Sequence, residues 1–339
     1  MQTSSFLRFS KWVLVLVFLV IAAGAVVRST QSGMGCPDWP KCFGQYIPPT
    51  KMEQVFFSAN INYPKGQFIR YNDSLWFAAT TFTSKENFDR TNWQHYNKHG
   101  YTKIVIYQTW IEYINRLLGA LLGIFLLIQL LWSLKFWSTN KKISGLCFAN
   151  VLLTGFQAWL GKTVVDTNLA GVKITTHLLV ALLIAVIALT VIYIVKQTKK
   201  VPTKKLYWLT LVGLLLLILQ IILGTQVREQ IDEISKTLAY GGRDRWVDKL
   251  DYVFLIHRSF SLLVAAIFLY VVYGFKKIGL KLFSNTLIVV CLFAEIILGI
   301  VMAYFDMPAI AQPLHLLFSS VLFVAAFYSW LNTGLNKSA

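Results

Sequence analysis

Three histidines and one asparagine lie in apolar segments, at positions that repeat between the two halves of the chain. Asn115 in the first half matches His257 in the second, and His177 matches His315. The second member of each pair follows the first by 62 residues in the first half and by 58 in the second. Neutral imidazole among membrane helices is a suitable axial ligand for haem iron, and ionisable groups within lipid are usually functional. The repeat therefore predicts two similar porphyrin sites.

The two predicted sites differ in their ligands. His257 and His315 can bind one iron from opposite faces, and such bis-imidazole ligation suits electron transfer because no coordination position stays open. The corresponding pair in the first half is Asn115 and His177, and asparagine is a poor ligand for haem iron. We therefore expect one haem that carries electrons and a second porphyrin, held by His177 alone or without iron coordination, that is acted upon. The competing interpretation of each histidine is a packing side chain that hydrogen-bonds to another helix.

Charged residues accompany both sites. Glu112 precedes Asn115 by three residues, whereas Phe254 precedes His257, so the carboxylate belongs to the first half alone. A carboxylate at an apolar site can act as a base or stabilise developing positive charge, and the alternative is an ion pair with Arg116. Arginines near the outer ends of the spans can clamp haem propionates or simply anchor the helices at the interface. These are Arg28 and Arg116 for the first site, and Arg228 and Arg258 for the second.

The helices that must position these residues appear in the hydropathy pattern. Of 339 residues, 56% are hydrophobic and only 14% are charged, against about a quarter charged in soluble proteins. Eight apolar runs are long enough to cross a bilayer. They cover approximately 11–28, 109–134, 143–161, 173–195, 206–226, 251–274, 283–304 and 311–332. The sequence therefore predicts an all-α integral membrane protein with eight transmembrane helices.

The net charge of +17 orients this protein in the membrane. With both termini inside, the inner segments contain 14 of the 32 basic residues and no acidic residue. This is the positive-inside bias of multi-pass membrane proteins. We therefore expect cytoplasmic termini, a long first loop on the outer face, contact with membrane lipid, and no nucleic-acid partner.

Four spans per half, with both halves in the same orientation, predict a parallel repeat of two pseudo-symmetric four-helix bundles. We assign residues 1–200 to the N-terminal bundle and 201–339 to the C-terminal bundle. The halves differ most in the first outer loop, 29–108, which is polar and aromatic and could form interfacial helices over the bundle mouth. Within it, Cys36 and Cys42 can close a disulfide on the oxidising face. A structural staple and a redox-active pair are both compatible with this spacing.

Together these features resemble the haem A synthases of bacteria and mitochondria over nearly the whole chain. The resemblance implies haem b as a cofactor on His257 and His315, and haem O as the substrate near His177 and Glu112. It also implies that the C8 methyl of haem O is oxidised to a formyl group, with water as the oxygen source and electrons leaving through haem b. The matching segments are Cys-Pro-Asp-Trp-Pro-Lys-Cys (36–42), Glu-Tyr-Ile-Asn-Arg (112–116), His-Leu-Leu (177–179), Leu-Gly-Thr-Gln-Val-Arg-Glu-Gln-Ile-Asp (223–232), His-Arg (257–258) and His-Leu (315–316).

The chain departs from the family pattern in two places. The family commonly has a fourth histidine where this chain has Asn115, which leaves His177 as the one predicted iron ligand for haem O. Some relatives have a second cysteine pair in the outer loop between spans five and six, but residues 227–250 contain no cysteine. The resemblance implies the inner membrane of a bacterial cell. Haem O synthase, cytochrome oxidase assembly factors and a second copy of this chain are candidate partners.

Two other functions fit part of the pattern. A non-catalytic di-haem b-type cytochrome would hold two stable b haems, and Asn115 disfavours it because one site lacks a ligand pair. A transporter for a small anion would use the paired arginines as a substrate clamp and would bind no haem. The sequence specifies neither the electron acceptor nor the oligomeric state.

Overall fold

The computed structural model describes residues 2–97, 104–167, 171–198 and 200–335. These residues contain eight helices that are long and apolar enough to cross a membrane. The predicted all-α class and the number of spans are therefore confirmed. The helices are α1 (Gln2–Ser29), α2 (Ile106–Ser133), α3 (Lys141–Asp166), α4 (Gly171–Val195), α5 (Lys204–Thr237), α6 (Tyr252–Lys277), α7 (Phe283–Tyr304) and α8 (Ala311–Leu331).

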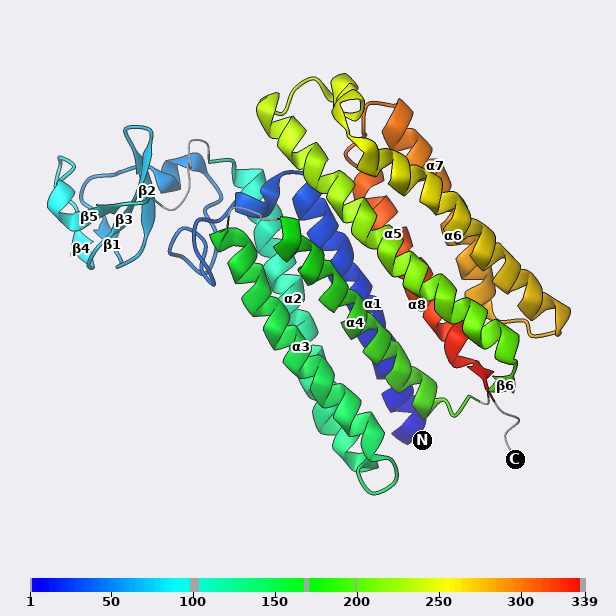
Figure 1. The fold of residues 1–339 in the computed structure, drawn as a ribbon. Helices are drawn as coiled ribbons and strands as arrows, with labels where there is room; N and C mark the ends of the chain where they lie inside the picture. Colours follow the sequence, from blue (N-terminus) through cyan, green and yellow to red (C-terminus); the bar gives the residue numbers. More distant parts are fainter. Residues whose placement is uncertain (1, 98–103, 168–170, 199, 336–339) are drawn as a thin grey trace.

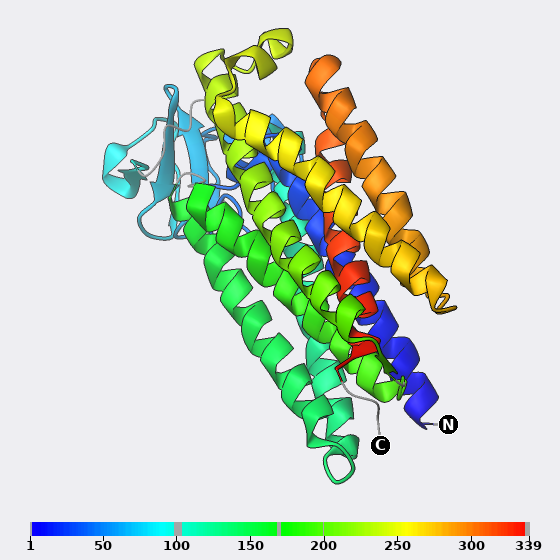
Figure 2. The same cartoon turned by 45° about the vertical axis from the view of Figure 1, so that its right-hand side comes forward.

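The helices pack in two sets that meet along α1, α4, α5 and α8 (Figures 1 and 2). In the first set, α1 and α3 each pack against α2 and α4. In the second, α5 and α7 each pack against α6 and α8. Apolar side chains join the sets, since Leu182 of α4 packs into the core of the second set and Val324 of α8 into that of the first. The order of neighbours matches the predicted repeat, and the symmetry of that repeat stays a prediction.

The outward faces of the helices are apolar. Leu131 on α2 is 67% exposed and Leu262 on α6 is 65% exposed. A helix satisfies its own backbone hydrogen bonds, so such faces are stable where hydrocarbon replaces water. Burial is lowest for α7 and highest for α4, which is therefore the most central helix.

The first and last described residues lie at the same end of the helices (Figure 1), as an even number of crossings requires. Near that end β6 (Val201–Pro202) pairs in parallel with β7 (Thr333–Gly334). Tyr193 Oη also donates to the carbonyl of Leu331 at 2.8 Å. These contacts fasten the connection between α4 and α5 to the end of α8.

The long outer loop forms a small β-rich lobe that projects from the opposite end of the first helix set (Figure 1), and not helices across the bundle mouth. One antiparallel sheet has the order β2 (Phe68–Tyr71), β3 (Ser74–Ala78), β5 (Trp93–His95), and β1 (Asn62–Tyr63) pairs with β4 (Phe82–Thr83). The turn between β2 and β3 consists of Asn72 and Asp73, both with positive φ. Two such residues between alternating aromatic and aliphatic segments favour a tight hairpin over a helix.

Helix α5 is longer than the hydropathy pattern predicts. The apolar run ends near residue 226, but the helix continues to Thr237. Beyond the run, Ile231 and Ile234 pack with Trp246 and Met307. This small apolar cluster stabilises the last turns of α5, which lie beyond the apolar run.

Candidate functional site

Three side chains on one face of α2 hold residues 35–44, which we call the disulfide loop. Thr109 Oγ1 donates to a loop carbonyl at 2.9 Å, and Glu112 Oε2 accepts from the backbone N–H of Cys36 at 2.9 Å. Arg116 Nη1 donates to two further loop carbonyls, each at 2.9 Å. Spacings of three and four residues place all three on the same face of the helix. The loop is therefore fixed directly over the candidate catalytic residue.

Glu112 is buried, with 4% of its surface exposed. Its Oε1 forms an ion pair with Arg116, so the pairing that the sequence allowed as an alternative is present. A buried carboxylate is stable only when paired and hydrogen-bonded, and here both oxygens have a partner. The catalytic role of Glu112 stays a prediction.

The predicted disulfide joins Cys36 to Cys42. Both cysteines are fully buried and pack against Phe43 and Phe68. Thiol–disulfide exchange needs an attacking thiolate to reach a sulfur, so burial of both sulfurs favours the structural staple over the redox-active pair. Within the loop, Asp38 Oδ2 accepts from the N–H of Gly44 at 2.9 Å, and burial raises the pKa of Asp38 above its usual value.

Three of the four repeated polar positions face a glycine on the preceding helix. A methyl group built on each glycine shows how close the partner side chain comes. At Gly24 and Gly161 the methyl group would make an ordinary van der Waals contact with the partner side chain, and at Gly224 it would clash. The pairs and distances are Gly24 with Asn115 Oδ1, 3.9 Å; Gly161 with His177 Cε1, 3.8 Å; and Gly224 with His257 Cε1, 2.9 Å.

A glutamine lies one turn before two of these glycines and hydrogen-bonds to the histidine backbone. Gln157 Nε2 donates to the carbonyl of His177 at 2.9 Å, and Gln220 Nε2 donates to that of His257 at 3.0 Å. In a bilayer an unsatisfied amide is costly. These bonds therefore fix the helix pairs α3–α4 and α5–α6 at the depth of the histidines.

The rings of His257 on α6 and His315 on α8 are close neighbours, with the edge of one ring toward the other. Their centroids are 6.5 Å apart and their planes cross at 75°. An imidazole nitrogen binds a metal at about 2 Å, so two rings on opposite sides of one ion have centroids roughly 6 Å apart. Both Nδ1 atoms are buried without a hydrogen bond within the described residues. The separation of the two rings is compatible with one metal ion between them, and haem binding at this pair stays a prediction.

The first half lacks such a pair. His177 Nδ1 and Asn115 Oδ1 are also buried, and neither forms a hydrogen bond within the part of the chain that the structure describes. Among the residues that the structure describes, no three or more histidine, cysteine or acidic side chains form a group that could hold a free metal ion.

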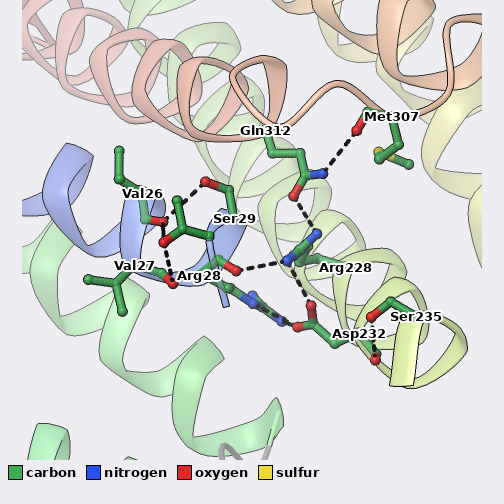
Figure 3. Close-up of polar contacts among 10 residues, drawn as sticks. Val26, Val27, Arg28, Ser29, Arg228, Asp232, Ser235, Met307 and Gln312 are labelled. Atoms are coloured by element: carbon green, nitrogen blue, oxygen red, sulfur yellow. Dashed lines mark hydrogen bonds and ion pairs between the residues drawn. The ribbon is translucent and has the colours of Figure 1, made fainter. Parts of the chain in front are cut away.

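Arg28 and Arg228 share one carboxylate, that of Asp232 (Figure 3). Arg28 donates through Nε and Nη2 to Oδ2 at 3.0 and 2.8 Å, and Arg228 Nη2 lies 2.7 Å from Oδ1. Arg228 also donates to the side chain of Gln312 on α8 and to the backbone carbonyl of Arg28. We call this cluster the arginine seam. It ties α1, α5 and α8 together where the two helix sets meet.

The predicted site arginines therefore have different surroundings. Arg28 and Arg228 lie in the seam, and Arg116 holds the disulfide loop. Arg258 is exposed, with its guanidinium carbon 5.8 Å from the centroid of the Phe254 ring. Their predicted contacts with haem propionates stay predictions.

Sequence reasoning missed two of the residues that complete this arrangement. Thr109 lies three residues before Glu112, and Asp232 lies four residues after Arg228. Helical spacing alone would have placed each beside its partner. A cavity of about 490 Å³ also lies between the lobe, the disulfide loop and the end of α3, but none of the three intramembrane histidines lines it.

Comparison with known proteins identifies the family of this chain. Residues 8–327 match the COX15-CtaA model, described as "Cytochrome oxidase assembly protein". The chain belongs to this family. It is similar to proteins named heme A synthase. The protein of that name from Shewanella oneidensis is 26% identical over 74% of this chain and 64% of its own length. The one from Ehrlichia canis is 22% identical over 92% of this chain and 88% of its own length. The match spans 56% of the corresponding protein of Pelagibacter ubique, which is 26% identical over 62% of this chain. The predicted family is thereby confirmed.

We predict that Gly224→Ala destabilises the protein while Gly161→Ala does not. The new methyl at Gly224 would lie 2.9 Å from the His257 ring, against 3.8 Å from the His177 ring at Gly161. Overpacking of this kind costs about 1–3 kcal/mol. Thermal unfolding of the purified variants in detergent measures the difference, and equal melting temperatures would contradict the close seating of His257.

We predict that Gly35→Ala loosens the disulfide loop. A methyl at Gly35 would lie 2.7 Å from the backbone oxygen of Gln108, so the loop must move off α2. The Cys36–Cys42 bond should then be reduced more rapidly by dithiothreitol, as followed by thiol alkylation and gel shift. Gly155→Ala, where a methyl meets nothing within 4 Å, is the matched control. Identical reduction rates would show that the loop does not depend on this contact.

Proposed function

We propose that the chain is a haem A synthase, an oxidoreductase that oxidises the C8 methyl of haem O to a formyl group. Family membership and the names of its relatives support this activity. The observation that carries the proposal is the difference between the halves. A buried carboxylate, Glu112, stands one helical turn before Asn115 in the half with the incomplete ligand pair, and the complete histidine pair lies in the other half.

The proposed reaction balances with water as the oxygen source. The methyl carbon loses two of its three hydrogens in two successive two-electron oxidations. In the first, water adds to the oxidised carbon and gives an alcohol, and in the second the alcohol is oxidised to the aldehyde. One water oxygen becomes the formyl oxygen, and four electrons and four protons leave in total. The electrons require an external one- or two-electron acceptor, and the protons require a base near the reacting carbon.

In the N-terminal helix set we propose that His177 binds the iron of haem O and that Asn115 belongs to the same substrate site. Glu112 stabilises positive charge that develops at the methyl carbon or activates the water that attacks it. Arg28 and Arg116 bind the propionates. Nη1 of Arg28 and Nε of Arg116 take no part in the hydrogen bonds described above, so each guanidinium retains a donor.

In the C-terminal helix set we propose that His257 and His315 hold haem b, with Arg228 and Arg258 near its propionates. When bound, haem b supplies one-electron transfer. With His257 and His315 both holding the group, it would be suited to electron transfer and not to binding another ligand. This division assigns substrate to residues 1–200 and cofactor to residues 201–339.

We further propose that the chain lies in the inner membrane of a bacterial cell with cytoplasmic termini and the β-rich lobe outside. The cluster of basic residues at the end that carries both termini supports this orientation. Haem O then reaches the first helix set from the lipid. A haem O synthase, cytochrome oxidase assembly factors and a second copy of the chain are the proposed partners.

We predict that Glu112→Ala abolishes haem A formation and retains haem b. Loss of a general base or charge stabiliser lowers the rate by about 10²–10⁴-fold. Membranes supplied with haem O are extracted, and the pigments are separated by chromatography. Glu53→Ala in the outer lobe, where the carboxylate is exposed, is the control. Unchanged haem A would reject this role, and wild-type protein that holds two b haems and makes no haem A would favour the di-haem cytochrome.

We predict that His257→Ala loses the low-spin b-type absorption spectrum, because only one imidazole remains for the iron. His95→Ala, an exposed histidine of the lobe, should keep it. Reduced-minus-oxidised spectra of the purified proteins provide the measurement. An unaltered spectrum in His257→Ala would remove His257 from the haem b site.

A further inference from the structure

Glu295 of α7 is an acidic residue in a transmembrane helix that the proposed reaction does not use. Its Oε2 lies 3.2 Å from His315 Nδ1, and the two side chains are only 16% and 25% exposed. Its other oxygen, Oε1, is buried and forms no hydrogen bond within the described residues. An acidic side chain at this depth is costly unless it has a partner. Its one ionisable neighbour at ion-pair distance in the described chain is the proposed haem ligand.

The contact involves Nδ1 of His315, which leaves Nε2 for the iron in the proposed haem site. With Nδ1 beside a carboxylate, Nδ1 carries the proton, and Nε2 keeps the lone pair that a metal needs. The distance of 3.2 Å is within reach of an N–H···O bond, although the present angle is not that of one.

The first half has no equivalent of this carboxylate. Gln157 occupies the matching position on α3, and its amide donates to the backbone of His177 and not to the ring. His177 Nδ1 has no hydrogen bond in the residues described. The two repeated histidines therefore have different partners. The Gln157 amide donates to the backbone carbonyl of His177 on α4, whereas the Glu295 carboxylate lies beside the ring of His315 on α8.

We propose that Glu295 is a positioning residue for the haem b ligand His315. By accepting the Nδ1–H of His315 it fixes the orientation of the ring and makes Nε2 a stronger donor, which favours the oxidised iron and lowers the midpoint potential. This inference rests on the proposed haem b site and adds to it. It also explains why one porphyrin is permanent and the other exchangeable, because His177 lacks such support.

The test uses the full-length protein purified with its haem. Glu295→Gln retains an oxygen that can accept the Nδ1–H but is a weaker acceptor, so we expect haem b to stay bound at a higher midpoint potential. Glu295→Ala removes the acceptor, and we expect a roughly 10- to 100-fold loss in haem affinity. Cys291→Ala, a buried free cysteine one turn earlier on α7, is the control and should change neither quantity.

Three measurements separate the outcomes: haem b content, the electron paramagnetic resonance signal of the low-spin iron, and the midpoint potential by redox titration. An unchanged potential and resonance signal in Glu295→Gln, together with normal haem content in Glu295→Ala, would overturn the positioning role alone. Wild-type protein without low-spin b-type haem would overturn the proposed haem site, and this inference with it.

Discussion

Space for a flat ring between closely packed helices is the constraint on which this structure depends. Each half must bring two helices close enough to form a bundle and still leave room for an imidazole or amide side chain. Gly24, Gly161 and Gly224 on the preceding helices face these side chains, and at Gly224 a methyl group would leave too little room for the ring. The closest of these contacts is that of Gly224 with His257, one of the two histidines whose rings are neighbours. The distance between the helices and the placement of these side chains therefore depend on the same residues.

Helix α2 connects this membrane framework to the outer face. The same helix carries Asn115 toward the bundle and Thr109, Glu112 and Arg116 toward the disulfide loop. The loop in turn packs against the β-rich lobe through Phe43 and Phe68. An insertion that looks peripheral in the sequence thus determines the surroundings of the buried carboxylate, which supports a structural purpose for the disulfide.

Much of the fold could be predicted from the sequence because lipid imposes a simple rule: an apolar run of sufficient length becomes a helix. The pairing of Cys36 with Cys42 was expected from their spacing, and the ion pair of Glu112 with Arg116 was an alternative that the spacing allowed. The lobe could not be predicted, because its strands are short and depend on contacts distant in sequence. The extension of α5 was missed for the same reason, since it depends on Trp246 and Met307.

The arginine seam makes the two halves of the chain complementary and not interchangeable. Arg28 and Arg228 occupy matching positions, but four residues later the first half has Ser32 and the second has Asp232. Two copies of the first half, meeting in the same way, would bring two guanidinium groups together with no carboxylate between them. Like-charge juxtaposition in a partly buried interface is strongly disfavoured. Although the two halves repeat, their interface is thus selective in the manner of a heterodimer: each half pairs favourably with the other and unfavourably with a copy of itself.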